Sequence, residues 1–266
     1  MSCGQFENAI SEETPTYKPL TPGAPYTCSF DPLDGSSVIG PNFSVGGIYA
    51  IWPAAHSLVG HSGRSVLASA VAVYGSRTTL FVGVRDSPHA LEFTLVGAEW
   101  VLSAPVVQLA KEAPNKIFAF GNLRASNDSR KYNDLLQFYL SNRYTLRYTG
   151  GMVPDVMHIL SKKGGVFTNC SSKKAKAKLR FLYEIAAIAL LVEVAGGGAV
   201  DESGKAMLDN VCDDDDMRVG GCIGSQSEVV NFLKIMGDDE AKTDGQLSDE
   251  VEARMKAGES IESIFK

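Results

Sequence analysis

Residues 30–37 of the chain read FDPLDGSS, which places two aspartates directly before a run of small residues. Residues 26–31 have the pattern of a short buried strand, which would deliver Asp31 to the edge of a sheet. Carboxylates as close as those of Asp31 and Asp34 repel each other unless a cation lies between them. Hard oxygen ligands of this kind suit Mg²⁺, with Mn²⁺ as a substitute. The stretch therefore predicts a Mg²⁺ site at a point where a strand ends.

The small residues Gly35, Ser36 and Ser37 add a second kind of site to the same turn. Their consecutive backbone N–H groups and two hydroxyls, at the start of a turn or helix, form a natural phosphate cradle. A metal beside a phosphate favours metal-assisted transfer of a phosphoryl group to water. The alternative for an isolated DxxDGS pattern is an acidic turn with serine caps. A serine nucleophile is disfavoured, because no histidine base lies nearby in the sequence.

Three further acidic residues are candidates for the same metal site. Glu12 and Glu13 lie shortly before the turn, where adjacent glutamates are either surface charge or ligands. Glu184 lies in the apolar segment LRFLYEIA, residues 179–186, and a carboxylate buried there needs a partner. That partner is either a metal ion or the side chain of Arg180, four residues earlier in the expected helix.

Composition and charge exclude several other classes of function. The 266 residues are 44% hydrophobic and 21% charged, so the chain can bury a sizeable core. A net charge of −6 without a long basic block argues against a nucleic-acid partner, although local cations can still hold a small phosphorylated substrate. The runs KKAKAK (173–178) and DDDD (213–216) are expected to be mostly solvated. No apolar run approaches the ~20 residues of a membrane span.

The cysteine pattern favours a reducing compartment. The five cysteines are widely spaced and form no CxxC or zinc pattern, so free thiols are expected. The first residues carry no secretory signal. We therefore expect a cytoplasmic protein, the alternative being a chloroplast or plastid protein whose transit peptide is missing from this sequence.

The first part of the chain reads mainly as strands. Residues 1–25 are expected to be loop, with a short helix end at residues 7–10. Period-two patterns predict strands at 26–31, 42–52, 66–74, 78–84, 91–94 and 99–102, with a hairpin turn at 75–77.

Helical patterns dominate after residue 120. Helices are expected at 132–140 with Ser126 as N-cap, at 152–160 with Pro154 in the first turn, at 179–194 and at 227–235, and extended segments at 144–148 and 165–167. This mixture predicts a layered α/β (α+β) fold. We expect an N-terminal subdomain at 1–120, a C-terminal sugar-phosphate subdomain at 121–240, and a helix or tail at 241–266.

Several ordered stretches together resemble the family of fructose-1,6-bisphosphatases and sedoheptulose-1,7-bisphosphatases, within the lithium-sensitive, Mg²⁺-dependent phosphatases. The resemblance extends from residue 11 to about residue 232. Its anchors are residues 11–13, 30–37, 121–124, 146–155, 175–180, 183–184 and 195–197. The segment RYTGGMVPD at 147–155 is similar to the sedoheptulose branch, as are GNLR at 121–124 and Trp52-Pro53.

The resemblance implies roles for individual residues. The metal ligands would be Glu12, Glu13, Asp31, Asp34, Glu184 and the Leu33 carbonyl, with Glu13, Asp31, Asp34 and Glu184 as the catalytic carboxylates. The phosphate to be hydrolysed would lie on Asp34, Gly35, Ser36 and Ser37. The distal phosphate would contact Asn122, Tyr148, Lys178 and Arg147, the last reaching across from a neighbouring subunit, and Met152 would contact the sugar.

The activity that the resemblance implies is Mg²⁺-dependent hydrolysis of the 1-phosphate of sedoheptulose 1,7-bisphosphate. The resemblance also implies a homodimer or homotetramer, and a sugar-phosphatase fold of alternating helix and sheet layers. The alternatives are a fructose-1,6-bisphosphatase and an inactive homologue that binds sugar phosphate. The chain departs from the family at three points: Asn169 replaces a phosphate-binding tyrosine of the fructose branch, Gly40 replaces an aspartate, and the N-terminal helices before residue 11 are expected to be missing.

Overall fold

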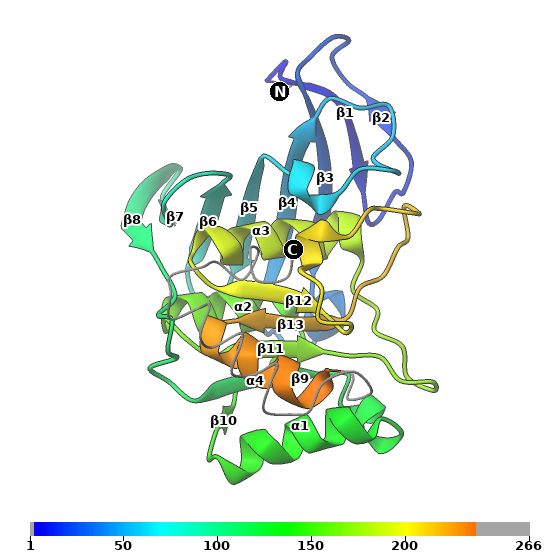
Figure 1. Cartoon of the computed structure of the whole chain (residues 1–266). Helices are drawn as coiled ribbons and strands as arrows, with labels where there is room; N and C mark the ends of the chain where they lie inside the picture. The colour runs from blue at the N-terminus through cyan, green and yellow to red at the C-terminus, as the bar shows by residue number, and fades with distance from the viewer. Residues whose placement is uncertain (1–2, 238–266) are drawn as a thin grey trace.

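The chain forms two β-sheets separated and covered by helices (Figure 1). The computed structural model describes residues 3–237, so the helix or tail expected after residue 240 lies outside the described residues. The larger sheet has the order β2-β1-β3-β4-β5-β6-β7-β8. Its strands are β1 (Phe6–Ser11), β2 (Lys18–Pro19), β3 (Tyr26–Asp34), β4 (Val45–Pro53), β5 (Ala68–Tyr74), β6 (Thr78–Val84), β7 (Ala90–Val96) and β8 (Glu99–Val107).

The smaller sheet has the order β10-β9-β11-β13-β12. Its strands are β9 (Ile117–Gly121), β10 (Thr145–Leu146), β11 (Val166–Asn169), β12 (Gly198–Asp201) and β13 (Gly221–Gly224). The helices are α1 (Arg130–Ser141), α2 (Met152–Ser161), α3 (Ala186–Val194) and α4 (Gln226–Met236), with short helical turns η1 (Ser36–Val38), η2 (Gly63–Ser65), η3 (Leu123–Asn127), η4 (Phe181–Ile185) and η5 (Met207–Asp209).

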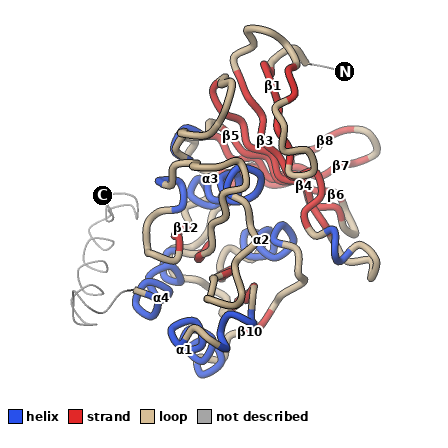
Figure 2. Tube along the Cα trace, turned by 90° about the vertical axis from the view of Figure 1, so that its right-hand side faces the viewer, coloured by secondary structure: helices blue, strands red, loops and turns tan. Residues whose placement is uncertain are grey.

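Sheets and helices alternate in four layers, as the views in Figures 1 and 2 show. The helices α2 and α3 lie between the sheets, because α3 packs on β5, β6 and β12 and α2 packs on β4, β5 and β11. The helices α1 and α4 pack on each other, and α4 covers β12 and β13. The alternating α/β layers expected from the sequence are confirmed.

The position of α3 explains its composition. Its sequence AAIALLVEV is buried from Ala186 to Val192, since a helix with a sheet on either side has no solvated face. One apolar cluster fills the space between the sheets around α2 and α3, and a second fills the space between the smaller sheet and the outer helices. The candidate site lies at one end of the layer that α2 and α3 form between the two sheets.

The structure corrects three expected elements. Residues 7–10 belong to β1, where Asn8 and Ile10 alternate inward and pair with β2 and β3, so the expected helix end was wrong. The helix α1 begins at Arg130 and is capped by Ser129 rather than Ser126, because the Ser129 hydroxyl accepts a hydrogen bond from the Tyr132 N–H. The helix expected at 179–194 begins only at Phe181, with a π-helical turn.

Other expectations are confirmed. The hairpin β5–β6 turns at residues 75–77, and α2 begins at Met152 with Pro154 in its first turn. All five cysteines are free. Within residues 3–237, no helix has both the length and the apolar character that crossing a bilayer requires.

Candidate metal and phosphate site

A β-bulge in β3 brings the two aspartates of FDPLDGSS to one face of the larger sheet. In a regular strand, residues three apart point to opposite faces. Asp31 pairs with Ile48 and Asp34 with Gly46, so three steps along β3 match two steps along β4. The extra residue at Pro32–Leu33 reverses the alternation. Asp31 and Asp34 are consequently both buried, at 5% and 7% exposure.

The third carboxylate reaches this face from a distant part of the chain. Ser29 of β3 donates a 2.6 Å hydrogen bond from its hydroxyl to the Leu182 carbonyl in η4, and accepts one of 2.9 Å from the Trp52 indole. This contact fixes the π-helical turn against β3, so Glu184 lies opposite Asp31. Glu184 is 8% exposed, and its carboxylate accepts a 2.5 Å hydrogen bond from the Arg180 backbone N–H.

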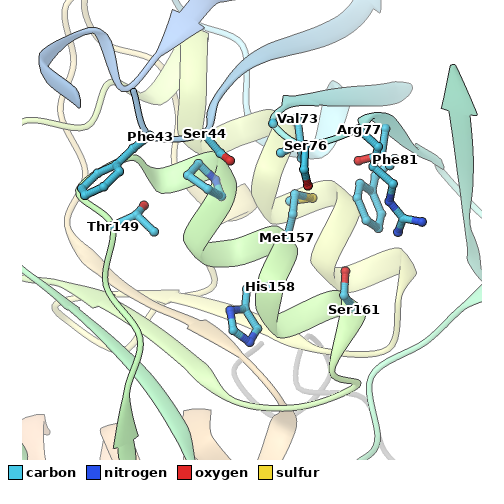
Figure 3. A pocket seen from close by; sticks show the side chains of 13 residues that line it. Phe43, Ser44, Val73, Ser76, Arg77, Phe81, Thr149, Met157, His158 and Ser161 are labelled. Carbon is cyan, nitrogen blue, oxygen red and sulfur yellow. The ribbon is translucent and has the colours of Figure 1, made fainter. Parts of the chain in front are cut away.

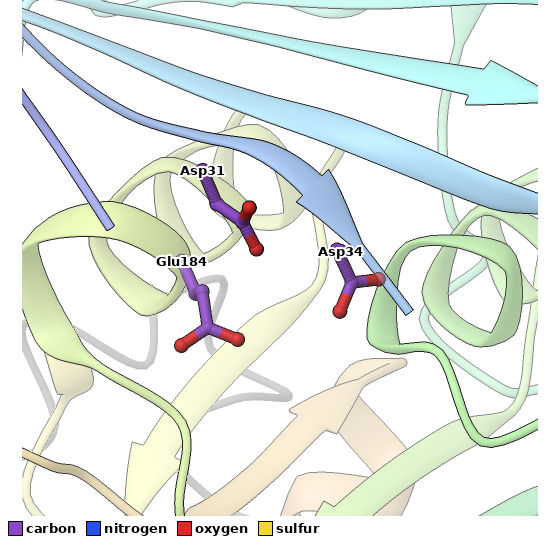
Figure 4. Close-up of side chains that lie close together, drawn as sticks. All are labelled: Asp31, Asp34 and Glu184. Carbon is purple, nitrogen blue, oxygen red and sulfur yellow. The ribbon is translucent and has the colours of Figure 1, made fainter. Parts of the chain in front are cut away.

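Asp31, Asp34 and Glu184 form a buried acidic cluster in which one ligand oxygen of each residue lies within 4.8 Å of the others (Figure 4). Among the described residues, no lysine or arginine side chain forms an ion pair with any of the three. Three carboxylates without a cation at this separation fit a divalent metal ion, whose preferred ligands are carboxylate oxygens.

The pKa values of all three carboxylates in the cluster are raised, as their burial and their closeness to one another require. Burial, and then the neighbouring carboxylates of Asp34 and Glu13, raise the pKa of Asp31 to about 6. Burial and the Asp155 carboxylate raise the pKa of Asp34 to about 6. Burial, with the charges of Asp34 and Asp31, raises the pKa of Glu184 to about 8. Each carboxylate is therefore costly to ionise until a cation is present.

The first turn of α2 holds Asp34 in place. The Val153 N–H donates a 2.6 Å hydrogen bond to the Asp34 carboxylate, and the Met152 N–H lowers the pKa of the same group. A helix N-terminus offers such unpaired donors to anions. The helix can approach β4 this closely because residue 46 is glycine: a Cβ there would lie 2.3 Å from Val153 Cγ1 and 2.5 Å from the Ala72 carbonyl.

The turn that the sequence predicts to cradle a phosphate leaves the sheet directly after Asp34. Gly35 has φ of 89°, a left-handed conformation that glycine adopts without strain, and it caps the short turn η1. A cavity of about 320 Å³ joins this turn to the acidic cluster; we call it the acidic cavity. Its lining includes Glu12, Glu13, Asp31, Leu33, Asp34, Gly35, Ser36, Ser37, Lys178, Arg180, Glu184 and Arg218.

Arg180 does not pair with Glu184 through its guanidinium, the partner considered from the sequence. The guanidinium contacts the carboxylate of Glu12 and, at 2.7 Å, that of Asp216. Glu12 therefore lines the acidic cavity as part of an ion pair, while Glu13 lies exposed at its mouth. The structure brings three of the five expected carboxylate ligands into one cluster and leaves these two beside it.

The expected distal contacts are spread more widely. Tyr148 is 47% exposed, and burial together with Asp155 and Asp34 raises its pKa. Arg147 is exposed, and its guanidinium donates to the Leu146 carbonyl. Met152 is buried at 3% exposure, whereas Lys178 is exposed on the wall of the acidic cavity. The side-chain amide of Asn122 donates hydrogen bonds of 2.8 and 3.0 Å to the carbonyls of Cys170 and Ala175.

Sequence reasoning missed three residues that shape the site. Ser29 fixes η4, Asp155 accepts a 2.8 Å hydrogen bond from the Thr149 N–H, and Arg218 lines the acidic cavity. The sequence offered one signal, since Asp155 follows Pro154 in the first turn of an expected helix, where acidic side chains are common. Nothing in the sequence around Ser29 or Arg218 indicated that these residues belong to a site.

A further cavity of about 420 Å³ lies along α2, and its lining includes Met157, His158 and Ser161 of that helix together with Arg77 and Phe81 (Figure 3). None of the described residues that line it is acidic. It is therefore unsuited to a metal ion, and the acidic cavity is the better candidate for chemistry.

Two domain profiles of one protein family match most of the chain. Residues 1–105 match the family profile "Fructose-1-6-bisphosphatase, N-terminal domain", and residues 111–237 match "Fructose-1-6-bisphosphatase, C-terminal domain". The chloroplastic sedoheptulose-1,7-bisphosphatase of Spinacia oleracea is 42% identical over 233 residues, which are 86% of this chain and 58% of that protein. The chain thus spans less than two thirds of the length of this relative.

Two other similar proteins differ in their stated substrates. A class 1 fructose-1,6-bisphosphatase of Geobacter metallireducens is 33% identical over 79% of this chain and 65% of its own length. The crystal structure of a Toxoplasma gondii protein assigned as a sedoheptulose-1,7-bisphosphatase superposes with a TM-score of 0.82 at 36% identity, covering 87% of this chain and 79% of that one.

Proposed function

The chain belongs to the fructose-1,6-bisphosphatase family, and on this basis we propose that it hydrolyses the 1-phosphate of sedoheptulose 1,7-bisphosphate, with Mg²⁺ as its cofactor. The products are sedoheptulose 7-phosphate and phosphate, within carbohydrate metabolism. The observation that carries the proposal is the single cavity in which the cluster of Asp31, Asp34 and Glu184 adjoins the turn at residues 35–37. Such a cavity can hold a metal ion and a phosphoryl group side by side.

Asp31, Asp34 and Glu184 would hold the metal ion, with Glu12, Glu13 and the Leu33 carbonyl as the further assigned ligands. A divalent cation bound there supplies positive charge for the phosphoryl oxygens and acidifies a water molecule. Mg²⁺ is the cofactor that an all-oxygen ligand set favours, and Mn²⁺ suits the same ligands.

The remaining steps belong to the chain itself. The backbone N–H groups and hydroxyls of Ser36 and Ser37, after the turn at Gly35, orient the phosphoryl group and stabilise the leaving oxygen. A water molecule attacks phosphorus in line from the side of the acidic cluster, the bond between phosphorus and the sugar oxygen breaks, and that oxygen takes up a proton from solvent. Glu13, exposed at the mouth of the cavity, is placed to accept the proton of that water.

The first test compares phosphate release from sedoheptulose 1,7-bisphosphate and fructose 1,6-bisphosphate, with Mg²⁺ and with excess EDTA. We expect release that depends on Mg²⁺ and is faster with the seven-carbon substrate. Faster release from the six-carbon substrate would support the fructose branch, to which the Geobacter relative belongs. Binding of either sugar without phosphate release would overturn the enzymatic proposal in favour of an inactive binding protein.

A homodimer or homotetramer is part of the proposal. Arg147 supports it, because among residues 3–237 its exposed guanidinium is bonded only to the neighbouring Leu146 carbonyl, which leaves it available to a second subunit. Light scattering on the purified chain gives the mass that tests this.

The free cysteines suit the cytoplasm or a plastid stroma, and the spinach relative is chloroplastic. We propose the cytoplasm, which imaging of the tagged protein would test.

A further inference from the structure

The acidic run of residues 213–216 is more than the solvated loop that the sequence predicts. Its four aspartates are exposed or half-buried, yet two of their carboxylates contact other segments of the chain. The Asp215 carboxylate accepts a 3.1 Å hydrogen bond from the Tyr17 hydroxyl, and the Asp216 carboxylate accepts one of 2.7 Å from the Arg180 guanidinium. The run is thus tied both to the loop that follows β1 and to the residue that precedes η4.

The backbone holds Asp216 beside Arg180 independently of their side chains. The Asp216 N–H donates a 2.8 Å hydrogen bond to the Asp214 carboxylate, which closes a tight turn within the run. Directly after this turn, Arg218 and Arg180 form an isolated antiparallel bridge, and the residues on either side of the bridge are joined by backbone hydrogen bonds of 2.8 and 3.1 Å. Asp216 is therefore fixed within reach of the guanidinium.

Asp216 binds two arginines that line the acidic cavity. Its carboxylate lies 2.7 Å from Nε of Arg180 and 3.2 Å from Nη2 of Arg218. The side-chain hydrogen bond from Arg180 lowers the pKa of Asp216, because it favours the ionised carboxylate. Asp216 consequently carries its negative charge at neutral pH and partly neutralises the two guanidinium groups.

The Arg180 guanidinium is shared between two carboxylates. Asp216 contacts its Nε and Glu12 contacts its Nη1, and within residues 3–237 these are its only acidic partners. Glu12 is also an assigned metal ligand, although it lies outside the cluster of three buried carboxylates. A metal ion held by that cluster and the guanidinium of Arg180 are therefore two cations that compete for the Glu12 carboxylate.

We propose that Asp216 is a positioning residue that holds the Arg180 guanidinium when the Glu12 carboxylate leaves it for the metal ion. This inference rests on the proposed function, which assigns Glu12 as a ligand. Without Asp216, the guanidinium has Glu12 as its only acidic partner, and breaking that ion pair leaves a partly buried cation without compensation. With Asp216 in place, Arg180 keeps a charge-assisted hydrogen bond throughout. Asp216 thus reduces the cost of transferring Glu12 to the metal ion.

Calorimetry with Mg²⁺ on the 266-residue chain tests the inference without requiring turnover. We expect Asp216→Asn to weaken Mg²⁺ binding about two- to fivefold, the effect of one partly exposed ion pair. Asp216→Glu should recover most of the affinity. The matched control is Asp213→Asn, which removes the same charge from an exposed carboxylate that forms no hydrogen bond or ion pair among the described residues. It should leave the affinity unchanged, and thermal melts should be alike for all three variants.

The same substitution in an Arg180→Gln background separates positioning from a direct effect of charge. Glutamine carries no charge and does not compete for Glu12, so this background should bind Mg²⁺ more tightly than the unaltered chain. Asp216→Asn should then have no further effect, because its partner is absent. Equal losses of Mg²⁺ affinity in both backgrounds would show that Asp216 acts on the metal ion by its own charge, and would overturn the inference.

Phosphate release distinguishes failure of this inference from failure of the proposed function. If no bisphosphate is hydrolysed but Asp216→Asn weakens Mg²⁺ binding only where Arg180 is present, the proposed function fails and the role of Asp216 stands. If bisphosphate is hydrolysed and Asp216→Asn changes neither the Mg²⁺ affinity nor the Mg²⁺ concentration that gives half the maximal rate, the enzyme stands and the inference fails.

Discussion

The Ser29 hydroxyl is hydrogen-bonded at 2.6 Å to the Leu182 carbonyl, although 153 residues separate them in the chain. Each partner lies two residues from a member of the acidic cluster, Ser29 from Asp31 and Leu182 from Glu184. The bond is buried and shared with the Trp52 indole. It therefore sets the distance between the strand and the helical turn that supply the proposed metal ligands.

Removing this bond should weaken both the fold and the metal site. Ser29→Ala leaves the Trp52 N–H without its partner in the core and removes the hydrogen bond to the Leu182 carbonyl, which costs about 1–3 kcal/mol of unfolding free energy. Urea unfolding measures that cost, and calorimetry measures the expected loss of Mg²⁺ affinity. Ser57→Ala, at an exposed loop serine, should change neither. Unchanged Mg²⁺ affinity in Ser29→Ala would mean that Glu184 does not depend on this contact.

Asp34→Asn should abolish Mg²⁺ binding and phosphate release while leaving the fold intact. The amide oxygen of asparagine can still accept the hydrogen bond from the Val153 N–H, so the first turn of α2 keeps its partner. The negative charge is lost, however, and with it one of three closely spaced carboxylates. Calorimetry with Mg²⁺ and a thermal melt separate the two effects. Full activity in this variant would contradict the metal assignment.

The stability of the metal-free protein should fall as pH rises from about 4 to about 8. Burial raises the folded-state pKa values of Asp31 and Asp34 from 3.8 to about 6, and that of Glu184 from 4.5 to about 8. The folded state therefore binds more protons than the unfolded chain in this window, and its stabilisation is lost as these groups ionise. Asp155, with a pKa raised to about 6 by burial, acts in the same direction.

Thermal melts in EDTA across this pH range test whether the stability of the metal-free protein falls as pH rises. Saturating Mg²⁺ should flatten or reverse the trend, because the ion favours the charged carboxylates, and its affinity should rise with pH. Asp34→Asn should reduce the slope in EDTA. A melting temperature that rises with pH in EDTA would show that the cluster is not protonated in the folded state.

Gly46→Ala should destabilise the protein by about 1–3 kcal/mol through overpacking. The new Cβ would meet Val153 Cγ1 and the Ala72 carbonyl, and the carbonyl cannot move without disturbing β5. Displacement of α2 would also draw the Val153 N–H away from Asp34, so Mg²⁺ affinity should fall. The matched control is Gly40→Ala, where nothing lies within 4 Å and stability should be unchanged or slightly higher. Equal stability of the two variants would contradict the close packing of α2 on β4.

The expectations from sequence were most accurate where a pattern is local. The β5–β6 hairpin and the start of α2 at Met152 follow from alternation, turn residues and Pro154, all within a few positions. They failed at residues 7–10, because a strand at the side of a sheet is specified by its partners β2 and β3 rather than by its own residues. They also missed the π-helical turn at η4, whose hydrogen bonds depend on how the turn packs against β3.

The FDPLDGSS turn by itself determined which side chains are available and predicted their chemistry: two carboxylates followed by a glycine and two serines, in an order that suits a metal beside a phosphate. The apolar segment around Glu184 marked it as a candidate, and the resemblance favoured a ligand over an ion pair, but neither placed it in space. Only the tertiary structure decided that the β3 bulge turns Asp31 and Asp34 to one face, that Ser29 draws Glu184 towards them, and that Glu12 pairs with Arg180. The physical reason is that side-chain types are local properties, whereas burial, strand register and charge pairing arise only when distant segments pack.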